Sequence, residues 1–359
     1  MIPWSLLIGG TGGALVLLAL NASLRGMCRS PWEAISLVGK IMSAVVQTLV
    51  QYVERGFRPE YPKWTLQFEL LRAVMQTCTD FRRYRRRIDP VRVNGLEHLW
   101  IRSLTSRKSD TKRLVIMYVH GGAFALLSPR FYSFFGATLA AAVDKELSSC
   151  GSNAQVDIFM ANYHKAPEYC FPTQPKDVVA AYEYLLDHEN LSTDRIILAG
   201  DSAGGGLVMS TLLRLRDSNL SHHLPLAAIV SSPFVDFSES IDPKCALKCI
   251  LTRRIAKACR VAYHPHCADR TTWVDASAVH CNLKGLPPML IQAATLDYLY
   301  QDSERLAAKA KADGVRDWEF DLHHGVSHVF SLFPSMILPY AEVGMQKMAA
   351  FAAKQFIKT

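Results

Sequence analysis

The sequence lacks the compositional biases of disordered and fibrous proteins. Glycine and proline, with 20 and 17 residues among 359, are not in excess, and no segment is repeated along the chain. Charged residues make up 20% of the chain and hydrophobic residues 50%, which excludes a mainly disordered, collagenous or polar low-complexity protein. A chain of this length buries a large core and has the size of a large α/β domain with a lid.

The first 24 residues lack charged side chains altogether. Residues 2–20 are mostly apolar, and this stretch is long enough to cross a bilayer as a helix. A cleaved signal peptide would carry positive charge before its apolar stretch, whereas the first basic residue here is Arg25. We therefore expect an uncleaved N-terminal membrane anchor over residues 1–24, with a cleaved signal peptide or a monotopic hairpin as alternatives.

The expected orientation of this anchor is contested within the sequence. Basic residues follow the apolar run, which by the positive-inside rule places the body of the protein in the cytoplasm. Asn-x-Ser glycosylation sequons, which favour the lumen instead, are present at Asn21, Asn190 and Asn219. Asn21 lies too close to the expected span to be modified, which leaves Asn190 and Asn219 as candidate glycosylation sites.

The basic residues are concentrated in the first third of the chain. Residues 25–113 contain 18 Lys and Arg against 8 Asp and Glu, a balance of +10. The densest run consists of Arg82, Arg83, Arg85, Arg86 and Arg87. No nucleic-acid recognition module accompanies this charge, so no nucleic-acid partner is expected. Two interpretations remain, a segment that lies against anionic lipid headgroups and a solvated helix face.

The cysteine spacing matches no CxxC…CxxC metal-binding pattern. Nine cysteines are present, so at least one thiol is unpaired within the chain. Five of them fall within 37 residues near two histidines, namely Cys245, Cys249, Cys259, Cys267 and Cys281 beside His264 and His266. Free packing thiols are the favoured interpretation, while a disulfide or a metal site stays open.

Two amphipathic helices are expected over residues 32–56 and 64–84, because apolar residues recur there at helical spacing. Apolar runs typical of strands then alternate with helical stretches. The expected strands are residues 114–119, 156–161, 195–199, 226–231, 289–293 and 318–322, and the expected helices are residues 131–147, 177–190, 204–217, 302–313 and 340–356. This alternation is typical of a mostly parallel sheet covered by helices on both faces. Residues 237–286 interrupt it and are expected to form an inserted, mainly helical lid.

The sharpest motif is Gly200-Asp201-Ser202-Ala203-Gly204, between an expected strand and an expected helix. That context is the one a nucleophile elbow requires, because only small residues fit a turn this tight. The turn would expose the hydroxyl of Ser202 to a substrate at the start of the helix. A chance match in a loop is the competing interpretation, and the flanking strand and helix argue against it.

A second motif, His120-Gly121-Gly122-Ala123, follows the expected strand 114–119 directly. Acyl transfer builds negative charge on a carbonyl oxygen, and each preorganised N–H donor aimed at that charge contributes about 3 kcal/mol. Glycines let the backbone approach the oxygen closely. We expect the N–H groups of Gly121 and Gly122, with that of Ala203, to form such an oxyanion hole. A tight turn is the competing interpretation.

A serine nucleophile needs a base and an orienting acid, which follow it in the order Asp, His in this class of motif. Asp297 lies just beyond the fifth expected strand and His328 beyond the sixth. His323 and His324 compete with His328 but lie at the strand end, which favours a structural role. Asp302 is the rival acid and is expected to cap the next helix.

Together these residues resemble the hormone-sensitive-lipase branch of the α/β-hydrolases. The two motifs above match its HGG[GA] and GDSAG sequences, with Ala123 in place of a third glycine. Residues 162–172 (NYHKAPEYCFP) resemble its Y-R-x-A-P-E-x-x-F-P signature. Asp297-Tyr298-Leu299 and His328-Val329-Phe330 resemble its D-x-L and H-x-F motifs, although the second acid of the former lies one residue late, at Asp302. The resemblance covers roughly residues 90–359.

The resemblance implies an α/β-hydrolase fold in which Ser202 is the nucleophile, His328 the base and Asp297 the orienting acid. The catalytic domain would span residues 90–359. Its cap would consist of the amphipathic helices in residues 25–89 and the insertion at about residues 237–286.

The resemblance also implies an activity. Membrane-anchored members such as arylacetamide deacetylase and fungal steryl acetyl hydrolase are similar in layout, remove acetyl or short acyl groups from lipophilic compounds and usually face the lumen of the endoplasmic reticulum. We therefore expect a serine esterase or deacetylase in that membrane, with a lipophilic ester substrate and with no cofactor or metal. An acyltransferase that uses the same triad and a non-catalytic binder on this fold are the alternatives. The oligomeric state is not indicated.

Overall fold

The fold is described by a computed structural model for residues 86–104, 112–218, 223–238, 249, 251–335 and 338–359. The expected anchor over residues 1–24 and the amphipathic segments 32–56 and 64–84 lie outside these residues, so their structure stays a prediction. Within the described part of the chain, no helix combines the length and the apolar character needed to span a membrane.

A single eight-stranded sheet forms the centre of the described residues, in the order β1-β2-β4-β3-β5-β6-β7-β8. Its strands are β1 (Arg86–Val93), β2 (Leu96–Ser103), β3 (Arg113–Val119), β4 (Gln155–Ala161), β5 (Ile196–Asp201), β6 (Ala227–Ser231), β7 (Met289–Ala294) and β8 (Trp318–His323). The β1–β2 and β2–β4 pairs are antiparallel, and all other neighbours are parallel. The expected mostly parallel sheet is confirmed.

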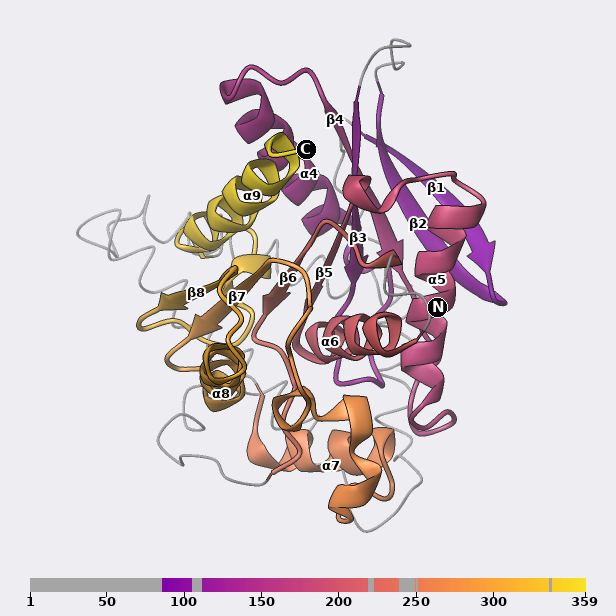
Figure 1. The fold of residues 1–359 in the computed structure, drawn as a ribbon, viewed down its shortest axis with the longest axis vertical. Helices are drawn as coiled ribbons and strands as arrows, with labels where there is room; N and C mark the ends of the chain where they lie inside the picture. The colour runs from indigo at the N-terminus through magenta and orange to yellow at the C-terminus, as the bar shows by residue number, and fades with distance from the viewer. Residues whose placement is uncertain (1–85, 105–111, 219–222, 239–248, 250, 336–337) are drawn as a thin grey trace, which may run out of the picture. The chain divides into compact units, whose positions relative to one another are not determined.

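Helices cover both faces of this sheet, as the alternating sequence pattern predicts (Figure 1). On one face lie α4 (Ser133–Ser149) and α9 (Ala341–Ile357), which pack against each other and share one hydrophobic core with the strands. On the other face lie α5 (Thr173–Asp187), α6 (Ser202–Asp217) and α8 (Tyr300–Ala312). Strands β3 to β7 are buried almost throughout, which explains why their sequences are continuously apolar rather than alternating.

The hairpin formed by β1 and β2 is a feature that the sequence analysis missed. Its turn consists of Asn94 and Gly95, both in the left-handed region with φ values of 50° and 76°. A two-residue turn of this kind needs positive φ at both positions, which Asn-Gly adopts readily. The Asn-Gly pair was therefore a usable hairpin signal ahead of the first expected strand.

For Arg86, both interpretations of the arginine run are wrong. This residue belongs to β1, and it lies neither against lipid headgroups nor on a solvated helix face. Its side chain is 8% exposed, pairs with Asp144 of α4 and donates to the carbonyl of Val156 at 2.7 Å. The free-energy cost of burying this guanidinium is offset by its ion pair and its hydrogen bond. Arg87 is exposed and pairs with Asp89 at 2.7 Å. The rest of the run lies outside the described residues.

Between β6 and β7 the described residues contain helices and no strand. They are α7 (Arg253–Tyr263) and the 3-10 helices η4 (Arg270–Thr272), η5 (Val274–Ala276) and η6 (Ala278–His280). Two further 3-10 helices, η1 (Thr193–Arg195) and η7 (Phe330–Leu332), precede β5 and follow β8. The six cysteines in the described residues are free thiols, and no side-chain cluster there is arranged to hold a metal ion.

Candidate active site

Ser202 stands at the junction where β5 passes directly into α6. Its φ is +51°, a strained backbone conformation for a residue with a side chain. The turn leaves no room for a larger neighbour, because a Cβ on Gly204 would lie 2.1 Å from the carbonyl oxygen of Val119. The expected strand–turn–helix context is present, and the helix begins at Ser202 rather than two residues later.

The hydroxyl of Ser202 lies in a continuous chain of hydrogen bonds with two of the residues that the sequence singles out. His328 Nε2 is 3.0 Å from Ser202 Oγ, and His328 Nδ1 is 2.8 Å from Asp297 Oδ1. All three side chains are buried, and that of Asp297 is fully so. The three residues follow three different strands, β5, β7 and β8, and they meet because parallel strands end at the same edge of a sheet.

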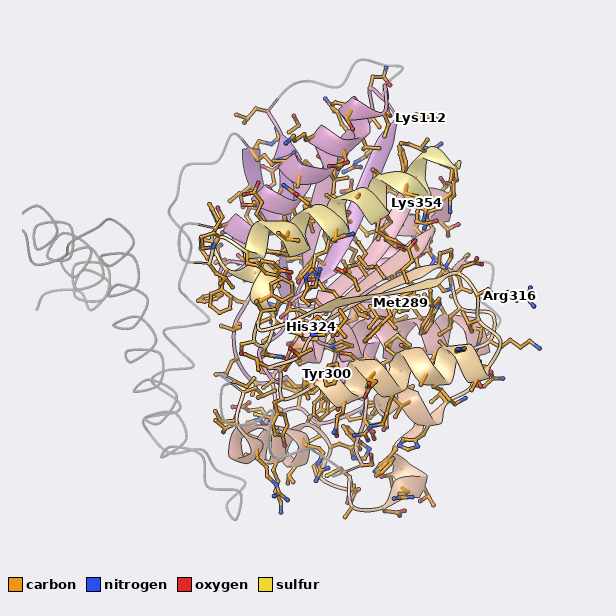
Figure 2. All side chains as sticks on the ribbon, turned by 90° about the vertical axis from the view of Figure 1, so that its left-hand side faces the viewer. Lys112, Met289, Tyr300, Arg316, His324 and Lys354 are labelled. Carbon is orange, nitrogen blue, oxygen red and sulfur yellow. The ribbon has the colours of Figure 1, made fainter. Side chains whose placement is uncertain are left out.

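Figure 2 makes this meeting of loops visible, since Tyr300, just after the β7 loop, and His324, just after β8, lie at the same end of the sheet. Arg316, which precedes β8, lies at the other end. Backbone hydrogen bonds join the two loops directly, from Leu296 N to Val326 O at 3.0 Å and from Thr295 N to His323 O at 2.9 Å.

The electrostatic environment of His328 favours its protonated form. Burial alone would lower the pKa of the imidazole, but the charge and the hydrogen bond of Asp297 and the charge of Asp201 together outweigh it, so the pKa is raised above the ordinary 6.5. Asp297 Oδ1 also accepts from Leu299 N at 2.9 Å and lies 3.8 Å from the thiol of Cys249. Burial raises the pKa of that thiol to about 11, so it contacts Asp297 as a neutral donor.

The rival residues of the sequence analysis lie elsewhere. His323 ends β8, with its two ring nitrogens 2.7 Å from Asp321 Oδ2 and 3.1 Å from Tyr340 Oη, contacts that support its structural interpretation. His324 is exposed in the turn that follows.

The expectation that Asp302 caps the next helix is wrong. It lies inside the first turn of α8, whose N-cap is Leu299. Its carboxyl group accepts from the backbone N–H groups of Val235 and Asp236, each at 3.1 Å. Burial and the neighbouring Asp236 carboxylate raise the pKa of Asp302 to about 8.

The loop that carries the HGGA motif lies beside Ser202, because Val119 at the end of β3 pairs with Gly200 of β5. The expected role of Gly121 as an oxyanion donor needs correction. Its N–H already donates to Asp201 Oδ1 at 3.0 Å, and a Cβ at this position would lie 2.2 Å from the other carboxyl oxygen. Glycine is therefore required here so that the loop can pack against Asp201.

Other N–H groups of the motif remain available to a substrate. Among the described residues, no protein acceptor is found for the N–H of Gly122 or of Ala123. The N–H of Ala203 belongs to the first turn of α6, where backbone donors have no partner within the helix. Gly122, Ala123 and Ala203 are therefore the candidate oxyanion donors, with Ala123 in the place that the sequence analysis gave to Gly121.

Asp201 is a site residue that the sequence analysis left without a role. Besides Gly121, it accepts from the hydroxyls of Tyr118 at 3.0 Å and Tyr132 at 2.9 Å. Burial raises the pKa of Asp201 to about 6 in spite of these hydrogen bonds. The carboxyl group thus holds the HGGA loop against the serine turn. No local sequence signal connects residues this far apart.

Aromatic side chains connect the HGGA loop to the insertion between β6 and β7. Phe124, directly after the motif, stacks on Tyr263 of α7 with ring centroids 3.7 Å apart and planes 5° apart. Phe234, whose N–H donates to Ser202 O at 2.9 Å, meets Phe124 edge-on at 5.8 Å. Stacked and edge-on pairs of this kind stabilise a contact beyond simple burial. The insertion is therefore packed directly beside the serine turn.

Known proteins are similar to this chain in sequence and in fold. The profile of the alpha/beta hydrolase fold matches residues 116–332, more than half of the chain. An acetyl-hydrolase of Streptomyces hygroscopicus is 32% identical over 234 residues, which cover 63% of this chain and 70% of that one. The arylacetamide deacetylase of Bos taurus is 32% identical over 116 residues, only 30% of this chain and 26% of that one.

A solved structure extends the similarity to nearly the whole fold. The crystal structure of an esterase from the bacterial hormone-sensitive lipase family has a TM-score of 0.67 and 27% identity, and the match covers 87% of this chain and 98% of that one. This chain belongs to the α/β-hydrolase fold family and, within it, to the hormone-sensitive-lipase branch.

Proposed function

We propose that this chain hydrolyses short-acyl esters, acetates above all, of lipophilic alcohols, with Ser202 as the nucleophile. The coarser assignment, a carboxylic ester hydrolase, follows from the family and from relatives named acetyl-hydrolase and esterase. The observation that carries the proposal is the hydrogen-bond chain from Ser202 through His328 to Asp297. A nucleophile, a base and an orienting acid in this arrangement form the constellation that activates a serine hydroxyl.

The first half of the proposed reaction forms an acyl-enzyme. Ser202 Oγ attacks the ester carbonyl carbon while its proton passes to His328 Nε2. Asp297 keeps the other ring proton on Nδ1 and stabilises the imidazolium that results. The C–O bond to the alcohol then breaks, and His328 returns the proton to the departing alkoxide.

The second half repeats these steps with water. His328 removes a proton from a water molecule, the oxygen of which attacks the acyl-enzyme, and Ser202 leaves with that proton as the carboxylic acid is released. In both halves we assign stabilisation of the oxyanion to the N–H groups of Gly122, Ala123 and Ala203. Each donor of this kind is worth about 3 kcal/mol in the transition state.

The acyl preference is tested with p-nitrophenyl esters from acetate to palmitate, with purified full-length protein. We expect kcat/KM to be highest for acetate or butyrate and to fall as the acyl chain lengthens. A rise in kcat/KM with chain length would contradict the short-acyl proposal and indicate a lipase. No observation favours the acyltransferase or the non-catalytic binder, and product analysis with an added alcohol acceptor separates transfer from hydrolysis.

The pH dependence of the reaction follows from the raised pKa of His328. The imidazole acts as a base only when it is neutral, so kcat/KM rises with pH through this pKa and then levels off. Because the pKa is raised, we expect the midpoint of this acid limb above pH 6.5. A pH profile of p-nitrophenyl acetate hydrolysis measures it directly, and a midpoint below 6.5 would contradict the assigned Asp297–His328 pair.

We also propose the N-terminal anchor over residues 1–24 and residence in the membrane of the endoplasmic reticulum. The support is the uncharged apolar sequence together with the two sequons. Of these, Asn190 is exposed in the fold and Asn219 lies outside the described residues. Carbonate extraction of membranes and endoglycosidase digestion test the anchor and the lumenal orientation separately.

A further inference from the structure

Lys165 is a buried cation beside the HGGA loop that the proposed reaction does not use. It is 8% exposed, at a position of the Y-R-x-A-P-E signature where the family resemblance specifies no residue. Its ammonium donates to Asn162 Oδ1 and to the carbonyl of Tyr163, both at 2.8 Å, and lies 3.1 Å from His120 Nε2. It also stands over the ring of Tyr163, 3.6 Å from the centroid.

This contact determines which nitrogen of His120 carries the proton. An ammonium group has three N–H donors and no acceptor, so His120 Nε2 accepts from Lys165 and cannot itself be protonated. The proton of the neutral ring must therefore be on Nδ1. There it donates to the carbonyl of Gly121, 2.6 Å away. Burial and the charge of Lys165 lower the pKa of His120 well below its usual value, so the ring stays neutral.

The carbonyl of Gly121 in turn orients the next N–H group. The hydroxyl of Tyr163, which donates to the carbonyl of His120 at 3.1 Å, also lies 3.3 Å from the Gly121 oxygen. The peptide bond between Gly121 and Gly122 is trans, so the carbonyl and the following N–H point in opposite directions. With its carbonyl held by the Nδ1–H of His120, this peptide unit presents the N–H of Gly122 on the side away from the His120 ring.

We propose that Lys165 is a positioning residue for the oxyanion hole, which fixes the Nδ1–H tautomer of His120 and thereby aims the N–H of Gly122 at the developing negative charge. The kinetic part of this proposal rests on the proposed esterase function. The tautomer itself does not, because it follows from the contacts of His120 with Lys165 and with the carbonyl of Gly121 alone. The two can therefore be tested apart.

The tautomer is tested by nitrogen-15 NMR of histidine-labelled wild-type protein, with the His120 ring assigned through its own backbone amide. At pH 7 we expect the proton of His120 on Nδ1, and no conversion to imidazolium when the pH is lowered to 5. A proton on Nε2 in the wild-type protein would overturn the proposal. This measurement needs no variant and no substrate, so it is independent of the esterase assignment.

The role of Lys165 is tested with Lys165→Met, which keeps the length of the side chain and removes the donors. We expect the proton of His120 to move to Nε2, where Asn162 Oδ1 at 3.4 Å becomes its acceptor. The carbonyl of Gly121 then loses its nearest donor. Because removal of a whole oxyanion donor costs about 10²- to 10³-fold in kcat, a misaimed one should cost roughly 10- to 100-fold, with KM little changed.

Two controls separate positioning from general damage. Lys309→Met removes a lysine that pairs with Asp313 far along α8, and we expect unchanged tautomer and kinetics. Inhibition by a trifluoromethyl ketone, which forms an oxyanion on the serine, should weaken in Lys165→Met by the same factor as kcat/KM. A folded Lys165→Met protein that retains the Nδ1–H tautomer, the wild-type kcat or the wild-type affinity for the ketone would contradict the proposal.

Discussion

Replacement of Ser202 by alanine is expected to lower kcat for p-nitrophenyl acetate by roughly 10⁴- to 10⁶-fold, because removal of a triad member removes the covalent route altogether. The residual rate would come from the oxyanion donors and from substrate binding. We expect little change in thermal stability, since alanine occupies the same strained backbone position and loses only the hydrogen bond to His328.

A matched control for this substitution is available a few residues beyond His328. Ser331 is fully buried, and its hydroxyl has no hydrogen-bond partner within the described part of the chain. Ser331→Ala therefore removes an equivalent atom from a buried site without a catalytic role. Wild-type kcat in Ser331→Ala together with the loss in Ser202→Ala would support Ser202 as the nucleophile. Unchanged activity in Ser202→Ala would contradict that assignment.

Replacement of Asp297 by asparagine should cost about 10⁴-fold in kcat. The amide would present an N–H to His328 Nδ1 and so favour the wrong tautomer, with the proton on Nε2 facing Ser202. The loss of negative charge should also lower the pKa of His328, because burial would no longer be outweighed. The rate and the pH profile of p-nitrophenyl acetate hydrolysis measure both effects, and we expect the acid limb to move to lower pH.

The control for this substitution is Asp302→Asn. Asp302 lies in the first turn of α8, directly after the loop that carries Asp297. With a pKa of about 8, Asp302 is mostly protonated at pH 7, so an amide replaces a neutral carboxyl group of similar shape. Its oxygen can still accept from the N–H groups of Val235 and Asp236. We expect near wild-type kcat, and a loss as large as that of Asp297→Asn would mean that the acid has been assigned wrongly.

The parts of the fold and site that could be predicted from sequence are those whose signals are local. The run of residues 195–199, the five-residue elbow and the helix after it follow one another along the chain, so the position of Ser202 between a strand and a helix could be predicted from sequence alone. Asp297 and His328 could be chosen because a parallel sheet gathers the carboxyl ends of its strands at one edge. The two hydrogen bonds of the His328 ring, to Asp297 and to Ser202, then follow from the fold.

The features that were missed depend on contacts between distant segments. Nothing near Gly121 in the sequence indicates that its N–H donates to Asp201, or that two tyrosines bind the same carboxyl group. Arg86 illustrates the same limit, because its charge is compensated by Asp144 from a helix further along the chain. The hairpin turn at Asn94 and Gly95 is different in kind, because its signal was present locally and was passed over.

The measurement that most directly tests the central claim is covalent labelling of the wild-type protein by diethyl p-nitrophenyl phosphate, followed by peptide mass spectrometry. An activated serine attacks phosphorus and releases p-nitrophenolate, which leaves a diethylphosphoryl group on its oxygen. We predict loss of esterase activity in proportion to labelling, with the adduct on Ser202 and none in Ser202→Ala. An adduct on a different residue, or complete inactivation with Ser202 unmodified, would contradict the claim that Ser202 forms the acyl-enzyme.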